Sequence, residues 1–82
     1  MKIKLGEMKE IKNNADINGD EDFEIFEWAV SNGDHIEAGE KLVEVMVGKA
    51  SLDICAPLNG IVTILSEDGE IVDAETEIAE IA

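Results

Sequence analysis

Residues 25–46 of this 82-residue chain resemble residues 61–82, 36 positions later, and the alignment needs no gap. Each copy has the pattern of a strand, a glycine turn, a short strand, a second turn and a strand. Two such copies predict a β structure with internal two-fold pseudosymmetry, in which each copy covers the apolar face of the other. The identical pairs are Ile25 and Ile61, Gly33 and Gly69, Ala38 and Ala74, and Glu44 and Glu80; the similar pairs are Asp34 and Glu70, Ile36 and Val72, Leu42 and Ile78, and Val45 and Ile81.

Apolar and polar residues alternate in short runs along the chain, and turn residues separate the runs. This period of two is typical of half-buried strands and not of helices. The sequence therefore predicts a single all-β domain over residues 1–82. The expected strands are Lys2–Leu5, Phe23–Val30, Lys41–Val47, Ser51–Ala56, Ile61–Leu65 and Glu77–Ile81, with short pieces around Ile36 and Ile71.

The charge balance is strongly acidic, with 6 lysines, no arginine and 20 carboxylates, for a net charge of −14. Nucleic acids and anionic membranes both require a cationic surface, so we expect neither as a partner and expect basic protein partners instead. A lone cysteine, Cys55, cannot form an internal disulfide. With no apolar stretch resembling a signal peptide or a membrane span, we expect a cytoplasmic protein.

The segment between the two copies contains a tight turn at Gly48-Lys49, between two strand patterns. A glycine at a hairpin tip supplies an unusual backbone angle, and such a turn would direct the Lys49 side chain into water. Lys49 is also the only cation after Lys41, since residues 50–82 hold eight carboxylates and no lysine. The simplest interpretation of such a lysine is a solubilising residue at a hairpin tip.

The chain resembles the lipoyl/biotinyl carrier-domain family over about residues 23–82. The motifs that carry the resemblance are Glu27-Trp28 with Val30, Gly33-Asp34, Glu37-Ala38-Gly39, Leu42-Val43-Glu44-Val45, Lys49-Ala50, and Ala56-Pro57 with Gly60. The resemblance implies a flattened β-barrel or sandwich of two four-stranded antiparallel sheets with quasi-two-fold symmetry. It also implies that Lys49 is the covalent attachment site, at the tip of an exposed hairpin.

The neighbours of this lysine distinguish the two branches of the family. Biotinyl domains typically place methionine on both sides, whereas lipoyl domains typically read Asp-Lys-Ala; here Gly48 and Ala50 flank Lys49. Ala50 and the missing methionines favour lipoic acid on Lys49 over biotin, and Gly48 departs from both patterns. Lys49-Ala50-Ser51 with Asp53-Ile54 and Pro57 is also similar to the glycine cleavage H protein.

The resemblance implies a carrier without an active site of its own, as in the 2-oxo acid dehydrogenase complexes. It would be monomeric in isolation and would shuttle acyl groups or reducing equivalents between active sites. The implied partners are a lipoate ligase or lipoyl transferase, and the dehydrogenase and dihydrolipoamide dehydrogenase components of a complex. A biotin carboxyl carrier and an unmodified β-barrel interaction module stay open as alternatives.

Residues 6–22 are longer, more polar and more acidic than the corresponding family loop, and we interpret them as an acidic surface loop that selects a partner. Part of this segment imitates a calcium-binding loop, through Asp16, Asn18, Asp20, Asp22 and Glu27. Its glycine falls at Gly19, where the pattern needs position 21, so we expect solvated carboxylates and no metal site.

Three further side chains are candidates for chemistry, and each has a simpler interpretation. The resemblance implies a core residue at the strand position of Trp28, and His35 lies beside a turn with no nucleophile motif. Cys55 alternates out of phase with Leu52 and Ile54, which predicts a buried or half-buried, inert thiol. We expect no catalytic residue.

Overall fold

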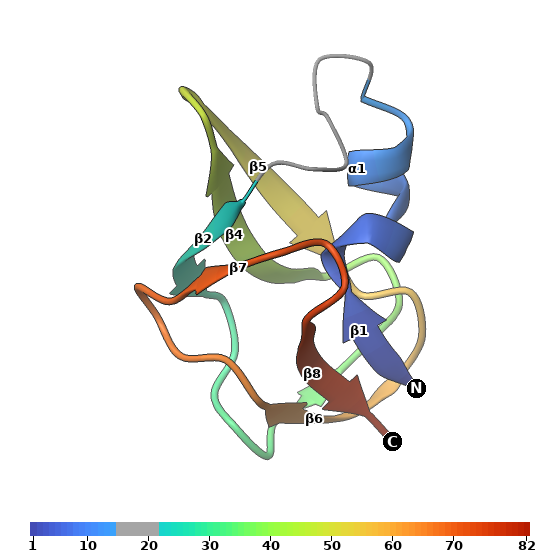
Figure 1. Cartoon of the computed structure of the whole chain (residues 1–82). Helices are drawn as coiled ribbons and strands as arrows, with labels where there is room; N and C mark the ends of the chain where they lie inside the picture. Colours follow the sequence, from blue (N-terminus) through green and yellow to red (C-terminus); the bar gives the residue numbers. More distant parts are fainter. Residues whose placement is uncertain (15–21) are drawn as a thin grey trace.

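The structure, a computed structural model, describes residues 1–14 and 22–82, and these form two four-stranded antiparallel sheets (Figure 1). The sheets have the strand orders β1-β8-β6-β3 and β5-β4-β2-β7. The predicted fold class, two four-stranded antiparallel sheets in a flattened barrel or sandwich, is confirmed. The strands are β1 (Lys2–Lys4), β2 (Phe23–Trp28), β3 (His35–Ile36), β4 (Lys41–Val47), β5 (Ala50–Cys55), β6 (Gly60–Ile64), β7 (Ile71–Val72) and β8 (Glu77–Ile81).

The internal repeat is present in three dimensions, and the two copies exchange their short strands. β7 pairs with β2 of the other copy, and β3 pairs with β6. The turns also match at the spacing of 36 residues. The backbone N–H of Ser31 donates to Asp34 Oδ2 at 2.9 Å, and that of Glu67 donates to Glu70 Oε1 at 3.0 Å. Each copy therefore completes the sheet of the other, which is a closer association than the covering of apolar faces that the repeat predicts.

The alignment of Ile25 with Ile61 is wrong by one residue. Ile25 is fully buried, whereas Ile61 is 44% exposed. In the structure Val62 is the equivalent of Ile25, because Val62 exchanges backbone hydrogen bonds with the turn at Gly33, and Ile25 does so with the turn at Gly69. The extra residue is Phe26, which lies in a bulge where the β2–β4 register shifts between Ile25 and Glu27. A bulge inserts one unpaired residue into a strand, and a gap-free comparison of sequences does not detect it.

The core lies between the two sheets and takes its side chains from both copies. Trp28 packs half-buried against this core, and its indole Nε1 donates to the backbone oxygen of Ser66 at 2.8 Å. The predicted core role of Trp28 is confirmed. The largest fully buried side chains are Phe23, Ile3, Leu5, Ile25, Ile36, Leu42, Ile54, Ile78 and Ile81.

The interpretation of residues 6–22 as an acidic loop needs correction at its beginning. A 3-10 helix, η1 (Leu5–Glu7), and one turn of α-helix, α1 (Lys9–Lys12), occupy this part. Leu5, Met8 and Ile11 are buried in the core cluster. Their spacing of three residues is the period of a helical face, which a search for the strand period does not detect. Residues 15–21 lie outside the described part of the chain. None of the described helices is long and apolar enough to cross a membrane.

Candidate functional site

β4, the longest strand, forms a hairpin with β5, and two residues close the hairpin at its tip. Val47 pairs with Ala50, which leaves Gly48 and Lys49 as the turn. Gly48 has a φ of 59°, and no described residue other than glycine has a positive φ. A positive φ at the first central residue alone is the pattern of a type II′ turn, whose twist matches that of the two strands.

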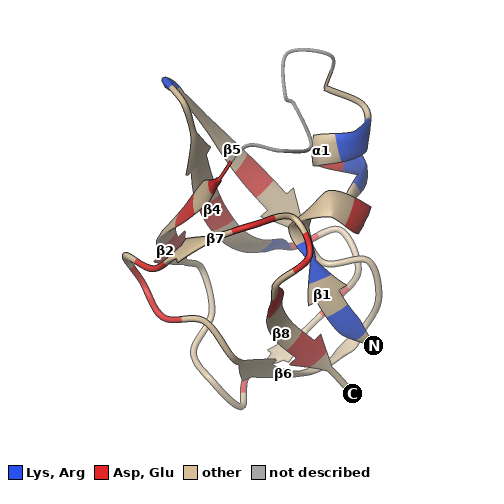
Figure 2. Cartoon of the chain, viewed as in Figure 1, with Lys and Arg blue, Asp and Glu red and all other residues tan. Residues whose placement is uncertain are grey.

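Lys49 is exposed at this tip, as the sequence predicts, and it makes no ion pair among residues 1–14 and 22–82. Figure 2 shows a blue tip on the hairpin, beyond strands that carry red segments. Lys41, at the other end of the hairpin, differs. Its ammonium lies 3.2 Å from Asp53 and 3.4 Å from Glu44, and the hydrogen bond to Asp53 raises its pKa. Within the hairpin, Lys49 is the amine that an approaching enzyme can reach without breaking an ion pair.

The two residues that flank Lys49 leave its amine accessible. Gly48 has no side chain and Ala50 has a methyl group, and both are exposed. Below the tip, Val47, Val45 and Ile54 are buried in the core cluster. The base of the hairpin is therefore held by apolar packing, while no ion pair among the described residues fixes the lysine at the tip. This arrangement fits a long covalent group on Nζ, since the group could move without disturbing the sheet.

The other candidate residues do not gather around Lys49. His35 is exposed on β3, and Cys55 is a half-buried free cysteine at the opposite end of β5 from the tip. In the described part of the chain, no three His, Cys, Asp or Glu side chains are placed to hold a metal. Of the calcium-like set, Asp22 and Glu27 are exposed, and Asp16, Asn18 and Asp20 lie outside the described residues.

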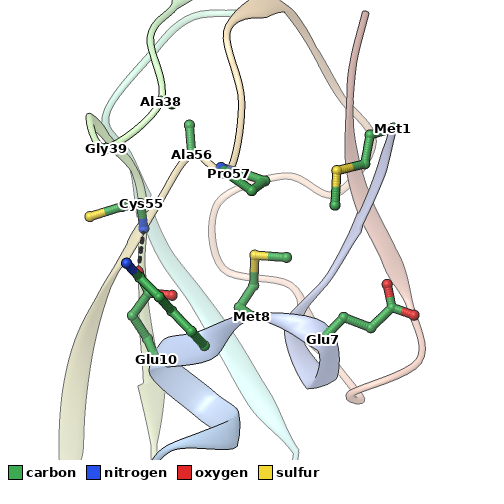
Figure 3. Close-up of a pocket in the computed structure, with 10 residues that line it drawn as sticks. Met1, Glu7, Met8, Glu10, Ala38, Gly39, Cys55, Ala56 and Pro57 are labelled. Carbon is green, nitrogen blue, oxygen red and sulfur yellow. Dashed lines mark hydrogen bonds between the residues drawn. The ribbon is translucent and has the colours of Figure 1, made fainter.

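A hollow of about 410 Å³ lies between the helical segment and the end of β5 (Figure 3). The Met1 and Met8 side chains border it, and the Cys55 sulfur points away from Met8. The carboxylate of Glu10, which also lines the hollow, accepts a hydrogen bond from the backbone N–H of Cys55 at 2.9 Å. That bond satisfies a backbone donor on the edge strand β5, so Glu10 has a structural role here. The remaining lining residues are Glu7, Lys9, Ala38, Gly39, Ala56 and Pro57.

Comparisons with known proteins agree with this geometry. A family model described as "Biotin-requiring enzyme", of the biotin/lipoyl type, matches residues 9–81. The mitochondrial acetyl-CoA carboxylase of Saccharomyces cerevisiae, in strains YJM789 and S288c, is 28% identical to this chain over 57 residues. The match covers 70% of this chain and 2% of the carboxylase, so the chain spans a very small part of that relative. Domains of this family are carriers with no active site of their own. The chain belongs to the biotin/lipoyl attachment-domain family.

Proposed function

We propose that this chain is a carrier domain acylated on Nζ of Lys49, and that the attached group is lipoyl. The observation that carries the proposal is the position of Lys49, which is exposed at the tip of a two-residue hairpin, between the small residues Gly48 and Ala50. No carboxylate in the described residues pairs with its amine. The family provides the chemical context, since its members hold lipoate or biotin covalently.

The attachment step needs nothing from this chain beyond a neutral amine. A ligase supplies the acid as an acyl adenylate, and Nζ attacks the acyl carbon. The new C–N amide bond forms as the C–O bond to phosphate breaks, so that AMP departs and the amine proton passes to a base of the ligase. Once attached, the dithiolane supplies the redox and acyl-transfer chemistry. The domain contributes a rigid support and a surface that partner enzymes recognise.

Lipoyl is favoured by the immediate neighbours of the lysine, since Ala50 follows it and neither flank is methionine. A biotin carboxyl carrier is the second candidate, because the curated relative is named as a carboxylase. An unmodified interaction module is the third, and Gly48, which fits neither family pattern, is what favours it.

As a lipoyl carrier the chain would move acyl groups or reducing equivalents between the active sites of a multienzyme complex. Its partners would be a lipoate ligase or lipoyl transferase, a dehydrogenase and dihydrolipoamide dehydrogenase. The acidic surface would suit basic docking sites on each of them.

The decisive experiment incubates the protein with lipoate ligase, lipoate and ATP, and in parallel with biotin ligase, biotin and ATP. Intact mass and peptide mapping then report the adduct. We expect one lipoyl group, on the peptide that contains Lys49. Lys49→Arg should abolish it, while Lys12→Arg, at an exposed lysine on α1, should leave it unchanged. A biotin adduct at Lys49 would establish the second candidate, and no adduct from either ligase would establish the third.

A further inference from the structure

The outward face of the β5-β4-β2-β7 sheet exposes apolar side chains among carboxylates. Phe26 on the β2 bulge is 49% exposed, and Ile71 on β7 is 63% exposed. Ile71 pairs across the strands with Glu24, and Glu24 pairs with the half-buried Met46 of β4. We call this surface, made of Phe26, Ile71, Met46, Glu24, Glu27, Glu44 and Asp53, the bulge face.

The bulge face continues directly into the hairpin that carries Lys49. Strands rise about 3.3 Å per residue and lie about 4.8 Å apart, which places Phe26 and Ile71 each about 14 Å from the tip. A protein interface of ordinary size covers about 800 Å² on each partner, a circle of about 16 Å radius. An enzyme that receives Lys49 in its active site at the centre of such an interface therefore has both apolar side chains within its reach.

The charges of this face specify the chemistry of the partner. Four carboxylates lie among the apolar side chains. Lys41, already paired with Glu44 and Asp53, is the one cation of the paired β2, β4 and β5 residues. The other sheet also exposes apolar residues, Ile61 and Leu65, but they lie on or beside β6, away from the hairpin. A protein interface combines apolar with polar side chains, and this face holds both.

We infer that the bulge face is the docking surface for the ligase that acylates Lys49, and that the ligase presents an apolar pocket surrounded by lysine and arginine. This inference rests on the proposed function and adds the surface through which it operates. The bulge has a defined use in this scheme, because the register with β4 shifts between Ile25 and Glu27, and Phe26, the residue between them, is left exposed while Ile25 stays fully buried.

The test measures acylation kinetics with lipoate ligase, lipoate and ATP, while the concentration of this protein is varied. Phe26→Ser and Ile71→Ser should each raise KM for the carrier about tenfold and leave kcat unchanged, as expected for interface residues that take no part in the chemistry. The matched controls are Ile61→Ser and Leu65→Ser, which remove exposed apolar side chains on or beside β6 of the other sheet. Circular dichroism verifies that every variant is folded.

A second pair of variants separates the effect of where a charge lies from the effect of the total charge of the protein. Glu27→Lys and Glu75→Lys change the net charge equally and both replace exposed residues, but only Glu27 belongs to the bulge face. We expect KM to rise several-fold more for Glu27→Lys, and the difference to shrink as salt screens the charges. Equal effects in both pairs, with normal labelling of Lys49, would overturn the docking surface and leave the carrier function in place. Absence of labelling in the unaltered protein would contradict both the docking surface and the carrier function.

Discussion

Gly48 occupies the one hairpin position whose backbone angle an L-residue adopts with difficulty. Its φ is 59°, and a Cβ added there would meet no atom of the described residues within 4 Å other than those of its chain neighbours, so the cost of substitution comes from the backbone and not from a clash. We expect Gly48→Ala to lower the free energy of unfolding by about 1 kcal/mol and Gly48→Val by about 2 kcal/mol. Gly48→Asp should cost less than Gly48→Ala, because aspartate tolerates positive φ better.

Urea denaturation monitored by circular dichroism measures these differences. Ser51→Ala, at an exposed strand position two residues beyond Lys49, is the control and should stay within about 0.5 kcal/mol of the parent. If valine at position 48 were as stable as glycine, the turn would not have the backbone described here.

Asp73 accepts hydrogen bonds from the Thr76 hydroxyl and from the backbone N–H of Glu75, both at 2.9 Å, and these bonds lower its pKa. A carboxyl whose pKa is lower in the folded protein contributes stability above its unfolded pKa, which is lost as pH falls through the folded value. We expect Thr76→Val to raise the Asp73 pKa toward the ordinary range, because it removes the hydroxyl donor. An NMR titration of the carboxyl carbons between about pH 2 and 6 reports this shift. Thr63→Val, on β6, is the control; an unchanged Asp73 pKa in Thr76→Val would contradict the bond.

The helical segment illustrates how an element shorter than two turns contributes through its packing. Ile11 is buried in the core cluster from a helix of four residues, and its neighbour Lys12 is exposed. We expect Ile11→Ala to destabilise the fold by about 2–4 kcal/mol through the lost burial and the cavity left behind. Lys12→Ala should change stability by less than about 0.5 kcal/mol. If denaturant titrations gave equal, small effects for both substitutions, the segment would be a surface loop and not part of the core.

Among the elements, those that the strand period and the glycine turns indicate are predicted correctly from the sequence. The strands on either side of Gly33, Gly48 and Gly69 are present, and so is the exposed hairpin tip at Lys49. The sequence does not predict the α1 turn, because four residues are too few to show a helical period. The period becomes visible only when Ile11 is taken together with Leu5 and Met8, which lie before the turn. The Phe26 bulge was missed because the register of a strand is set by its partners, which a linear comparison does not contain.

The whole molecule is one interlocked unit, since each copy of the repeat supplies the short strand that the other lacks. Separating the copies would leave both sheets incomplete and expose the apolar residues between them. This arrangement explains how so short a chain can hold the hairpin rigidly although no described ion pair holds the lysine at its tip. The support for Lys49 comes from residues of both copies, including Val45 and Ile78 in the shared core.

The same molecule carries a net charge of −14, which sets how salt affects its stability. Carboxylates repel one another across the folded surface, and the three ion pairs of the described residues are exposed pairs that contribute little. Salt screens both, but repulsion among the 20 acidic groups, which only 6 basic groups offset, outweighs the three attractions. We therefore expect Tm to rise by roughly 5 °C between about 10 mM and 300 mM NaCl, which corresponds to about 1 kcal/mol for a domain of this size. Differential scanning calorimetry measures it, and Glu75→Lys, with less charge, should show a smaller rise. A Tm that fell with salt would mean that the ion pairs, and not the repulsion, dominate the electrostatics of the fold.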